Sequence, residues 1–282
     1  MAGRDSVAGV PYPNFAGKHE HATLVEPAAF VQYWIDQGRL PADAATPAGV
    51  IMLYQRPLFD FVRRQPDVSP FAPVGSRHTA FLDLHTFDTT GGTVGVIGGF
   101  GIGAPAAIAI MESLAALGTR RLVGVGTAGA LVPGLAVGDV VVCSRAVRDE
   151  GVSHHYLPSA RWADPDAGLT KGLSEQLDAA GLSPIAARAW TIDAPYRETV
   201  AEARHYVDDG VAVVEMEAAA LFTVGQVRGV EVAAAFAVSD SLADGEWVPQ
   251  FGDARLADHL VRMVSAGVAA LDANGNPDGD GA

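Results

Sequence analysis

Apolar residues along the chain fall into short runs that alternate with segments of helical spacing. The runs at 94–97 and 122–125 are rich in β-branched or aliphatic residues and are typical of buried strands. Between them, apolar residues recur at the helical period from Pro105, where a helix can begin, to Gly118, where it can end. This stretch predicts a strand, a glycine-rich turn, a helix and a second strand.

The same alternation continues over most of the sequence. It predicts an α/β fold: a single three-layer domain with a mixed, mostly parallel twisted sheet flanked by helices. Further strands are expected at 50–54, 81–85, 140–143, 186–192, 211–214 and 231–238. Further helices are expected at 27–38, 58–64, 169–181, 200–207, 215–228 and 258–271.

The 282 residues divide into three regions by pattern. Residues 1–45 are expected to be an N-terminal extension with one short helix. Residues 46–271 carry the α/β pattern, and 49% hydrophobic residues overall supply a sizeable core. Residues 272–282 contain mainly Gly, Asp, Asn and Pro, so we expect a disordered tail.

Composition excludes several classes of function. The formal net charge is −14 and the pI is about 4.8, and no basic patch could follow a phosphate backbone, so nucleic acid is not an expected partner. No signal peptide and no membrane-spanning run is visible, which predicts a cytoplasmic protein without a membrane partner. Cys143 is the only cysteine, and His154 and His155 lack helical zinc spacing, so no metal site is expected.

Two glycine-rich stretches stand where strands are expected to end. The first has glycines at 98, 99, 101 and 103, and the second reads Gly-Thr-Ala-Gly from 126 to 129. Backbone N–H groups in such loops suit phosphate and other oxyanions. No acid ends the following strand as in a dinucleotide fold, and no Gly-Lys-Ser/Thr sequence indicates a P-loop. Two loops at neighbouring strand ends can line one pocket.

Three acids follow apolar runs and are candidates for chemistry. Glu215 and Glu217 open an expected helix, where acids often only complement the helix dipole. If both were helical they would lie about 200° apart, so one should point inward and one outward. Asp240 follows a long strand and could either cap the segment 241–246 or serve as a proton donor.

Four ordered motifs together resemble a known enzyme family. The motifs VGVIGGFGIGAP, VGVGTAGAL, VVEMEAAALF and AVSDSL, spread over roughly 50–271, resemble the nucleoside phosphorylases of the hexameric purine nucleoside phosphorylase and uridine phosphorylase type. The resemblance implies phosphorolysis of a nucleoside to free base and pentose 1-phosphate, a place in nucleotide salvage, and a homo-oligomer, hexamer or dimer. It implies no cofactor, with phosphate as co-substrate and purines favoured over uridine.

The resemblance also implies roles for individual residues. Met216 and Glu217 would hold the ribose, and Asp240 would protonate or hydrogen-bond a purine leaving group. A histidine near the N-terminus, His19 or His21, would reach a neighbouring subunit's sugar. The full substrate-binding set is Thr127, Ala128, Gly129, Tyr196, Glu215, Met216 and Glu217, and the phosphate set is Gly101, Thr127, Arg56 and Arg77.

The sequence departs from the family at the phosphate site. Relatives carry Gly-Asp-Pro-x-x-Arg after the first strand, where this chain reads Tyr-Gln-Arg-Pro-Leu, and an arginine where this chain has Gly124. Arg56, or Arg77 across a subunit interface, could substitute. Three hypotheses stay open: a phosphorylase, a hydrolase that uses water on the same fold, and a nucleoside-binding protein without catalysis.

Overall fold

The structure is a computed structural model of the chain and describes residues 12–15, 17–71 and 83–273. Arg77 lies outside these ranges, and so do positions 274–282 of the expected tail. The last described helix ends at Ala273. Within the described part of the chain, no helix is long and apolar enough to cross a bilayer.

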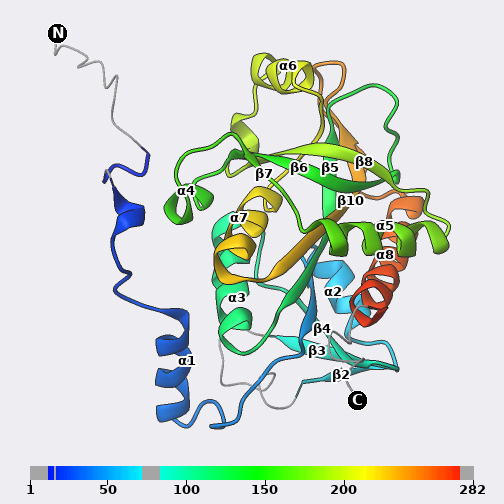
Figure 1. The fold of residues 1–282 in the computed structure, drawn as a ribbon. Coiled ribbons are helices and arrows are strands. Elements are labelled where there is room, and N and C mark those ends of the chain that lie inside the picture. The colour runs from blue at the N-terminus through cyan, green and yellow to red at the C-terminus, as the bar shows by residue number, and fades with distance from the viewer. Residues whose placement is uncertain (1–11, 16, 72–82, 274–282) are drawn as a thin grey trace.

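One mixed sheet organises the described residues (Figure 1). Its strands are β1 (Gly49–Leu53), β2 (Val68–Pro70), β3 (Leu84–Thr89), β4 (Gly92–Gly98), β5 (Arg121–Ala130), β6 (Val140–Asp149), β7 (Trp162–Ala163), β8 (Ile185–Ile192), β9 (Val211–Glu215), β10 (Glu231–Ser241) and β11 (Val248–Pro249). Their order is β11-β10-β6-β8-β9-β5-β1-β4-β3-β2, with β7 beside β6 and β5 also paired to β10. The pairings of β5, β10, β6, β8 and β9 therefore close into a ring.

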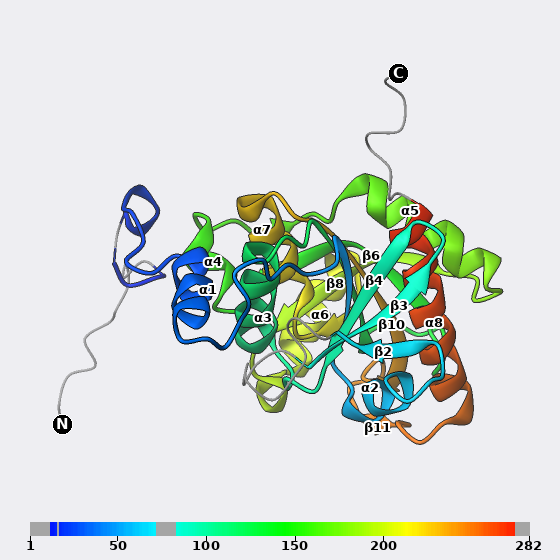
Figure 2. The same ribbon diagram turned by 90° about the horizontal axis from the view of Figure 1, so that it is seen from below.

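Helices cover both faces of this sheet (Figures 1 and 2). They are α1 (Pro27–Asp36), α2 (Arg56–Val62), α3 (Ala104–Ala116), α4 (Ser153–Tyr156), α5 (Ala167–Ala179), α6 (Val200–Asp208), α7 (Ala218–Arg228) and α8 (Ala254–Ala273), with short 3₁₀ turns η1 (Lys18–Glu20) and η2 (Pro195–Arg197). One buried core lies under α1, α3 and α7, and a second under α2, α5 and α8. The layers confirm the predicted three-layer α/β fold.

The parallel pairings bring the predicted glycine stretches together. β1 lies between β4 and β5, with Leu53 opposite both Gly98 and Val125. All five residues of β1 are buried, as the apolar run predicts for a central strand. The carboxyl ends of β1 and β4 therefore lie beside Val125 of β5, which continues past them, on the side where open α/β sheets bind ligands.

Several predicted boundaries differ from the structure, and two of these differences extend the central strands. The Gly-Thr-Ala-Gly stretch is strand rather than loop, because β5 continues to Ala130 and pairs with β10 and β9 there. Its small residues fit between two neighbouring strands. Likewise β6 runs on to Asp149, six residues beyond the apolar run at 140–143 that predicted it.

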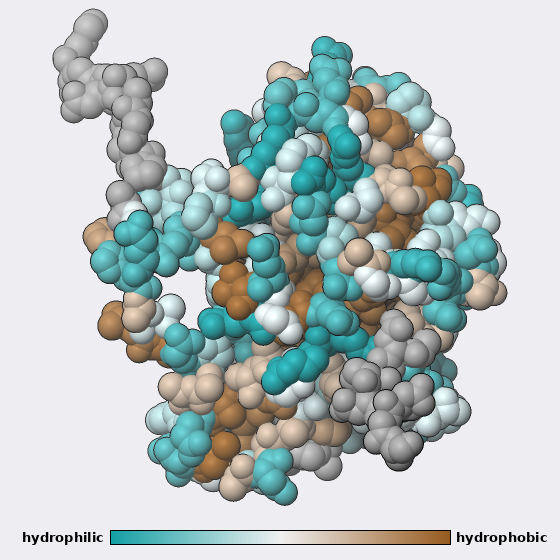
Figure 3. Space-filling view, viewed as in Figure 1, coloured by the Kyte–Doolittle hydropathy of each residue, from teal (hydrophilic) through white to brown (hydrophobic). Residues whose placement is uncertain are grey.

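The N-terminal arm, which is the described part of residues 1–45, lies partly apart from the α/β domain. Figure 3 shows an opening between the arm and the body of the molecule. A cavity of about 840 Å³ lies here, lined by arm residues that include Leu24 and Phe30 and by Glu112, Tyr156 and Arg228 of the body. Leu24 is fully exposed. The arm thus leaves apolar side chains without cover in this chain.

Candidate active site

Glu215 lies just before the N-terminus of α7. It ends β9, and its carboxylate accepts hydrogen bonds from the backbone N–H groups of Glu217 at 2.7 Å and Ala218 at 2.8 Å. The Thr191 hydroxyl donates to its other oxygen. Burial raises the pKa of Glu215 although these donors oppose the rise. Both carboxylate oxygens are therefore engaged within the chain, and Glu215 caps the helix that follows it.

Glu217 links α7 to the glycine stretch before α3. Its buried carboxylate accepts a hydrogen bond from the Gly103 backbone N–H, and the Met216 methyl lies 3.7 Å from where a Gly103 Cβ would stand. Burial raises the pKa of Glu217, and the Glu215 charge adds to the rise. The expectation that one glutamate points outward is wrong: α7 begins only at Ala218, and both side chains are buried.

Asp240 is buried at the end of β10. The Ser239 hydroxyl donates to its Oδ1 at 2.6 Å, and the Trp247 indole N–H donates to its Oδ2 at 2.9 Å. The expected capping role is wrong, because β10 continues through Ser241 and no helix follows. Trp247 carried no signal in the sequence: it lies in a connecting loop seven positions after the residue that it contacts.

The register of β5 places the remaining predicted residues. Gly129 pairs with Asp240 on one side and Val214 on the other. A Cβ on Gly129 would stand 3.2 Å from Asp240 Oδ2, and the Ala128 carbonyl oxygen lies 3.5 Å from the Ser239 hydroxyl. The strand pairing thus gathers Ala128, Gly129 and Asp240 at one place.

Gln55 and Arg56 occupy the carboxyl end of β1. The Gln55 amide donates to the Thr127 hydroxyl at 2.9 Å. Arg56 Nη1 lies 3.2 Å from where a Gly99 Cβ would stand, while its Nε donates to Asp60 at 2.9 Å. This hydrogen bond holds the pKa of Asp60 below its usual value. Arg56 is therefore beside the predicted oxyanion loop, where Gly101 has open space. The sequence pattern did not single out Gln55, because a glutamine directly after a strand matches no functional motif.

Tyr54 explains why position 124 has no side chain. Its ring lies along β5, so a Cβ on Gly124 would stand 2.8 Å from the Tyr54 hydroxyl and one on Gly126 would stand 2.7 Å from the ring. The Phe100 ring packs edge-on against the Tyr54 ring, with 6.1 Å between the ring centres. The buried hydroxyl has no hydrogen-bond partner among the described residues, and burial together with the Glu217 and Glu215 charges raises the pKa of Tyr54.

Several predicted residues are not gathered here. Tyr196 lies on η2 and is 99% exposed, in contact with no part of this site. His19 hydrogen-bonds the His154 carbonyl oxygen at 2.9 Å, and His21 lies beside Phe15 in the N-terminal arm. Within the described ranges, no group of three or more His, Cys, Asp or Glu side chains could hold a metal ion.

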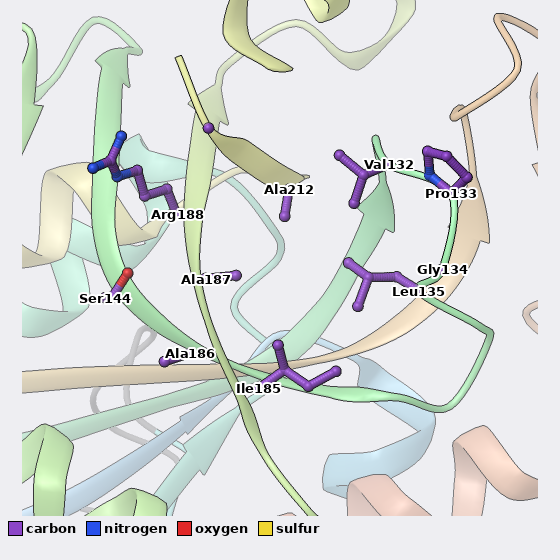
Figure 4. A pocket seen from close by; sticks show the side chains of 11 residues that line it. Val132, Pro133, Gly134, Leu135, Ser144, Ile185, Ala186, Ala187, Arg188 and Ala212 are labelled. Carbon is purple, nitrogen blue, oxygen red and sulfur yellow. The ribbon is translucent and has the colours of Figure 1, made fainter. Parts of the chain in front are cut away.

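Two hollows lie near the end of β5. One, of about 470 Å³, is lined by Glu198, Leu242 and Trp247, and thus adjoins Asp240. Figure 4 shows the other, of about 490 Å³, which is bounded by Val132, Leu135 and Ile185 and has Ser144 and Arg188 as its polar side chains. None of the predicted site residues lines either hollow. Only the first is linked to the candidate active site, through Trp247, which lines it and donates a hydrogen bond to Asp240.

A family comparison covers most of the part of the chain that carries this site. Residues 59–268 match the model of the Phosphorylase superfamily. The chain belongs to this superfamily. Because the match spans most of the α/β domain, it includes the glycine stretch, β5, the start of α7 and Asp240.

Curated relatives are about 30% identical to this chain over the part that aligns. A purine nucleoside phosphorylase DeoD-type from Caldanaerobacter subterraneus is 30% identical over 155 residues, which are 52% of this chain and 65% of the relative. A uridine phosphorylase from Haemophilus influenzae is 32% identical over 143 residues, 46% of this chain and 57% of the relative. The aligned part thus covers under two thirds of each relative.

Solved structures extend the likeness in fold. A uridine phosphorylase from Vibrio fischeri matches with a TM-score of 0.66 and 25% identity, over 80% of this chain and 92% of that one. A purine nucleoside phosphorylase from Toxoplasma gondii matches with a TM-score of 0.69 at 21% identity, over 82% and 93% of the two chains, which supports the fold.

Proposed function

We propose that the protein is a nucleoside phosphorylase: inorganic phosphate breaks the N-glycosidic bond and releases the base and a pentose 1-phosphate. The observation that carries this proposal is a pair of links: Glu217 is hydrogen-bonded to the glycine stretch at Gly103, and Gly129 pairs with Asp240 on one side and with β9, the strand that leads to Glu217, on the other. Relatives named for purine and for uridine phosphorolysis support the reaction class. No cofactor is needed, because phosphate is the second substrate.

The buried carboxylates fit the electronic demands of the reaction. Cleavage of a glycosidic bond passes through an oxocarbenium-like sugar. Glu217 can accept hydrogen bonds from the 2′- and 3′-hydroxyls and favours positive charge on the ring, with Met216 against the sugar. Asp240 can supply the proton that a purine needs as it leaves. This role favours purines over uridine.

The cavity beside Asp240 has the size of a small-molecule site. Its walls include the Leu242 side chain, the Trp247 indole and Glu198, together with Arg204 and Glu246. Burial and the Asp240 charge raise the pKa of Glu198 to about 7. A base in this cavity would meet apolar and aromatic surface on its faces and a carboxyl group at its edge.

Phosphate would lie at the end of β1, by the glycine stretch. Backbone N–H groups, the Thr127 hydroxyl and the Arg56 guanidinium are the donors for it there. Arg56 is exposed and can turn from Asp60 toward an anion. Since Tyr54 fills the space over Gly124, a hydrolase that uses water is the second candidate.

The products of purine nucleosides and uridine, with and without phosphate, test the proposal. Pentose 1-phosphate, formed only with phosphate, is the expected result. Free ribose at a rate indifferent to phosphate would establish the hydrolase instead. Tight binding of a nucleoside without turnover would leave a binding protein.

We infer in addition that the protein is a cytoplasmic homo-oligomer, a hexamer or a dimer, that serves nucleotide salvage. The exposed apolar residues of the N-terminal arm, Leu24 and Phe30 among them, support association because water-exposed apolar surface of this kind marks protein contacts. Light scattering of the full chain measures the mass. A fully active monomer would contradict the oligomer.

A further inference from the structure

The indole of Trp247 is held over Asp240 by a hairpin. β11 returns antiparallel to the end of β10, with Asp240 opposite Pro249 and Ser241 opposite Val248. The loop between them carries Trp247 back so that its Nε1 donates to Asp240 Oδ2 at 2.9 Å. The residue is nevertheless 61% exposed, and the Phe251 ring lies 6.3 Å away, centre to centre. A mostly exposed tryptophan that is held in place by a hydrogen bond from its N–H group indicates that this N–H group has a function.

The two oxygens of Asp240 differ in what their partners can do. An indole N–H can only donate, whereas a serine hydroxyl can donate and accept. Oδ2 faces the indole and must remain an acceptor. Oδ1 faces the Ser239 hydroxyl, which also lies 3.5 Å from the Ala128 carbonyl oxygen. If Oδ1 carries a proton, the serine can turn its own hydrogen toward the Ala128 carbonyl oxygen, so that it no longer donates to Oδ1.

We propose that Trp247 is a positioning residue for Asp240: its indole N–H holds Oδ2 as an acceptor, so that Oδ1 is the oxygen that carries the proton for the leaving base. This inference rests on the proposed function. When the C1′–N bond breaks, its electron pair leaves with the base, and the base nitrogen takes the proton from Oδ1. C1′ bonds to a phosphate oxygen, and Asp240 remains as a carboxylate that Trp247 stabilises until water returns a proton.

The test compares two substrates in Trp247→Phe, which keeps an aromatic ring and removes the N–H. With a purine nucleoside, kcat should fall about 10- to 100-fold, the usual effect of one hydrogen bond to a charged group, and KM should change little. With 4-nitrophenyl β-D-ribofuranoside, whose leaving group needs no proton, kcat should stay within about 3-fold. Phe251→Leu changes the ring that packs beside Trp247 but keeps the indole N–H, and should leave both substrates unaffected.

An equal fall with both substrates, an effect on KM alone, or no effect would overturn the proposal. A wild-type protein that cleaves neither substrate would overturn the proposed function, and the role of Trp247 would fall with it. The contact itself has a separate readout. The Trp247 indole N–H resonance, identified by its loss in Trp247→Phe, should move in Asp240→Ala, and a resonance that stays in place would show that the contact does not exist.

Discussion

At the base and sugar end of the candidate site, buried carboxylates are held by donors of this chain, whereas the nucleophile end is built mainly from neutral groups. Glu217 and Asp240 each accept hydrogen bonds that fix their orientation. At the end of β1, by contrast, Tyr54 and Gln55 have buried oxygens without partners among the described residues. The cation beside the loop there, Arg56, is mostly exposed.

The chain therefore fixes the geometry of one end of the site before substrate arrives, and leaves the other end to be completed by the substrate. The groups that would meet sugar and base are already oriented, and electrostatic catalysis depends on such preorganisation. The oxyanion would instead recruit Arg56 from its ion pair with Asp60.

Removing the carboxylate at the sugar should have the largest effect. Glu217→Ala removes the acceptor of two ribose hydroxyls, each charge-assisted hydrogen bond being worth about 1.5–3 kcal/mol. We expect kcat/KM for ribonucleosides to fall about 10²- to 10⁴-fold. The fall should be smaller for 2′-deoxynucleosides, measured side by side. Unchanged ribonucleoside kinetics would remove Glu217 from the site.

At the base, Asp240→Asn should slow chemistry more than binding. The amide accepts the Trp247 hydrogen bond but cannot deliver a proton, and general acid catalysis contributes about 10²- to 10⁴-fold. We expect kcat for purine nucleosides to fall within that range while substrate Kd, measured by calorimetry, changes little. A loss of binding with unchanged kcat would assign Asp240 to recognition alone.

A substitution at the nucleophile end should have a smaller effect on the kinetics, and the effect should be confined to the KM for phosphate. Arg56→Ala removes a guanidinium beside Gly99, and one such contact is worth about 1.5–3 kcal/mol. The KM for phosphate should rise about 10- to 100-fold with little change in nucleoside KM. Arg64→Ala, an exposed arginine just past α2, is the matched control. Equal kinetics of both variants would mean that Arg56 does not hold phosphate.

The packing of Tyr54 on Gly124 can be tested through stability. Gly124→Ala places a Cβ 2.8 Å from the tyrosine hydroxyl and should lower the free energy of unfolding by about 1–3 kcal/mol, as overpacking does. The double variant with Tyr54→Phe removes the clashing oxygen and should recover most of this loss. Gly252→Ala has no neighbour within 4 Å and is the control. Denaturant unfolding measures all of these, and a neutral Gly124→Ala would show that the ring can move aside.

The sequence predicted the fold better than the site. Strand and helix periods placed most elements, since buried runs and helical faces are local patterns. The extension of β5 through Gly-Thr-Ala-Gly was missed because glycine usually marks a turn, and only its pairing with β9 and β10 makes it strand. Gln55, Tyr54 and Trp247 were missed because their importance comes from what lies opposite them in space. The exposed Tyr196 was predicted from a motif whose tertiary setting the sequence does not contain.

The smallest expected effect concerns Glu198, in the cavity wall next to Asp240. Its pKa is raised to about 7 by burial, by the Asp240 charge and by Glu202, so the folded state binds its proton more tightly than the unfolded chain does. The stability linked to that proton is fully present below the unfolded pKa near 4.5 and is lost as pH rises through 7.

Glu198→Gln should therefore match the wild type near pH 4.5 and be more stable above pH 7. Because the side chain is half-buried and screened by water, we expect a gain of at most about 1 kcal/mol. Thr199→Ala, next in the chain and also in the cavity wall, should show no such pH-dependent gain, and urea unfolding at both pH values makes the comparison. If the stability difference between Glu198→Gln and the wild type is the same at both pH values, ionisation of Glu198 does not oppose folding. The repulsion between Glu198 and Asp240 would then be weaker than their proximity indicates.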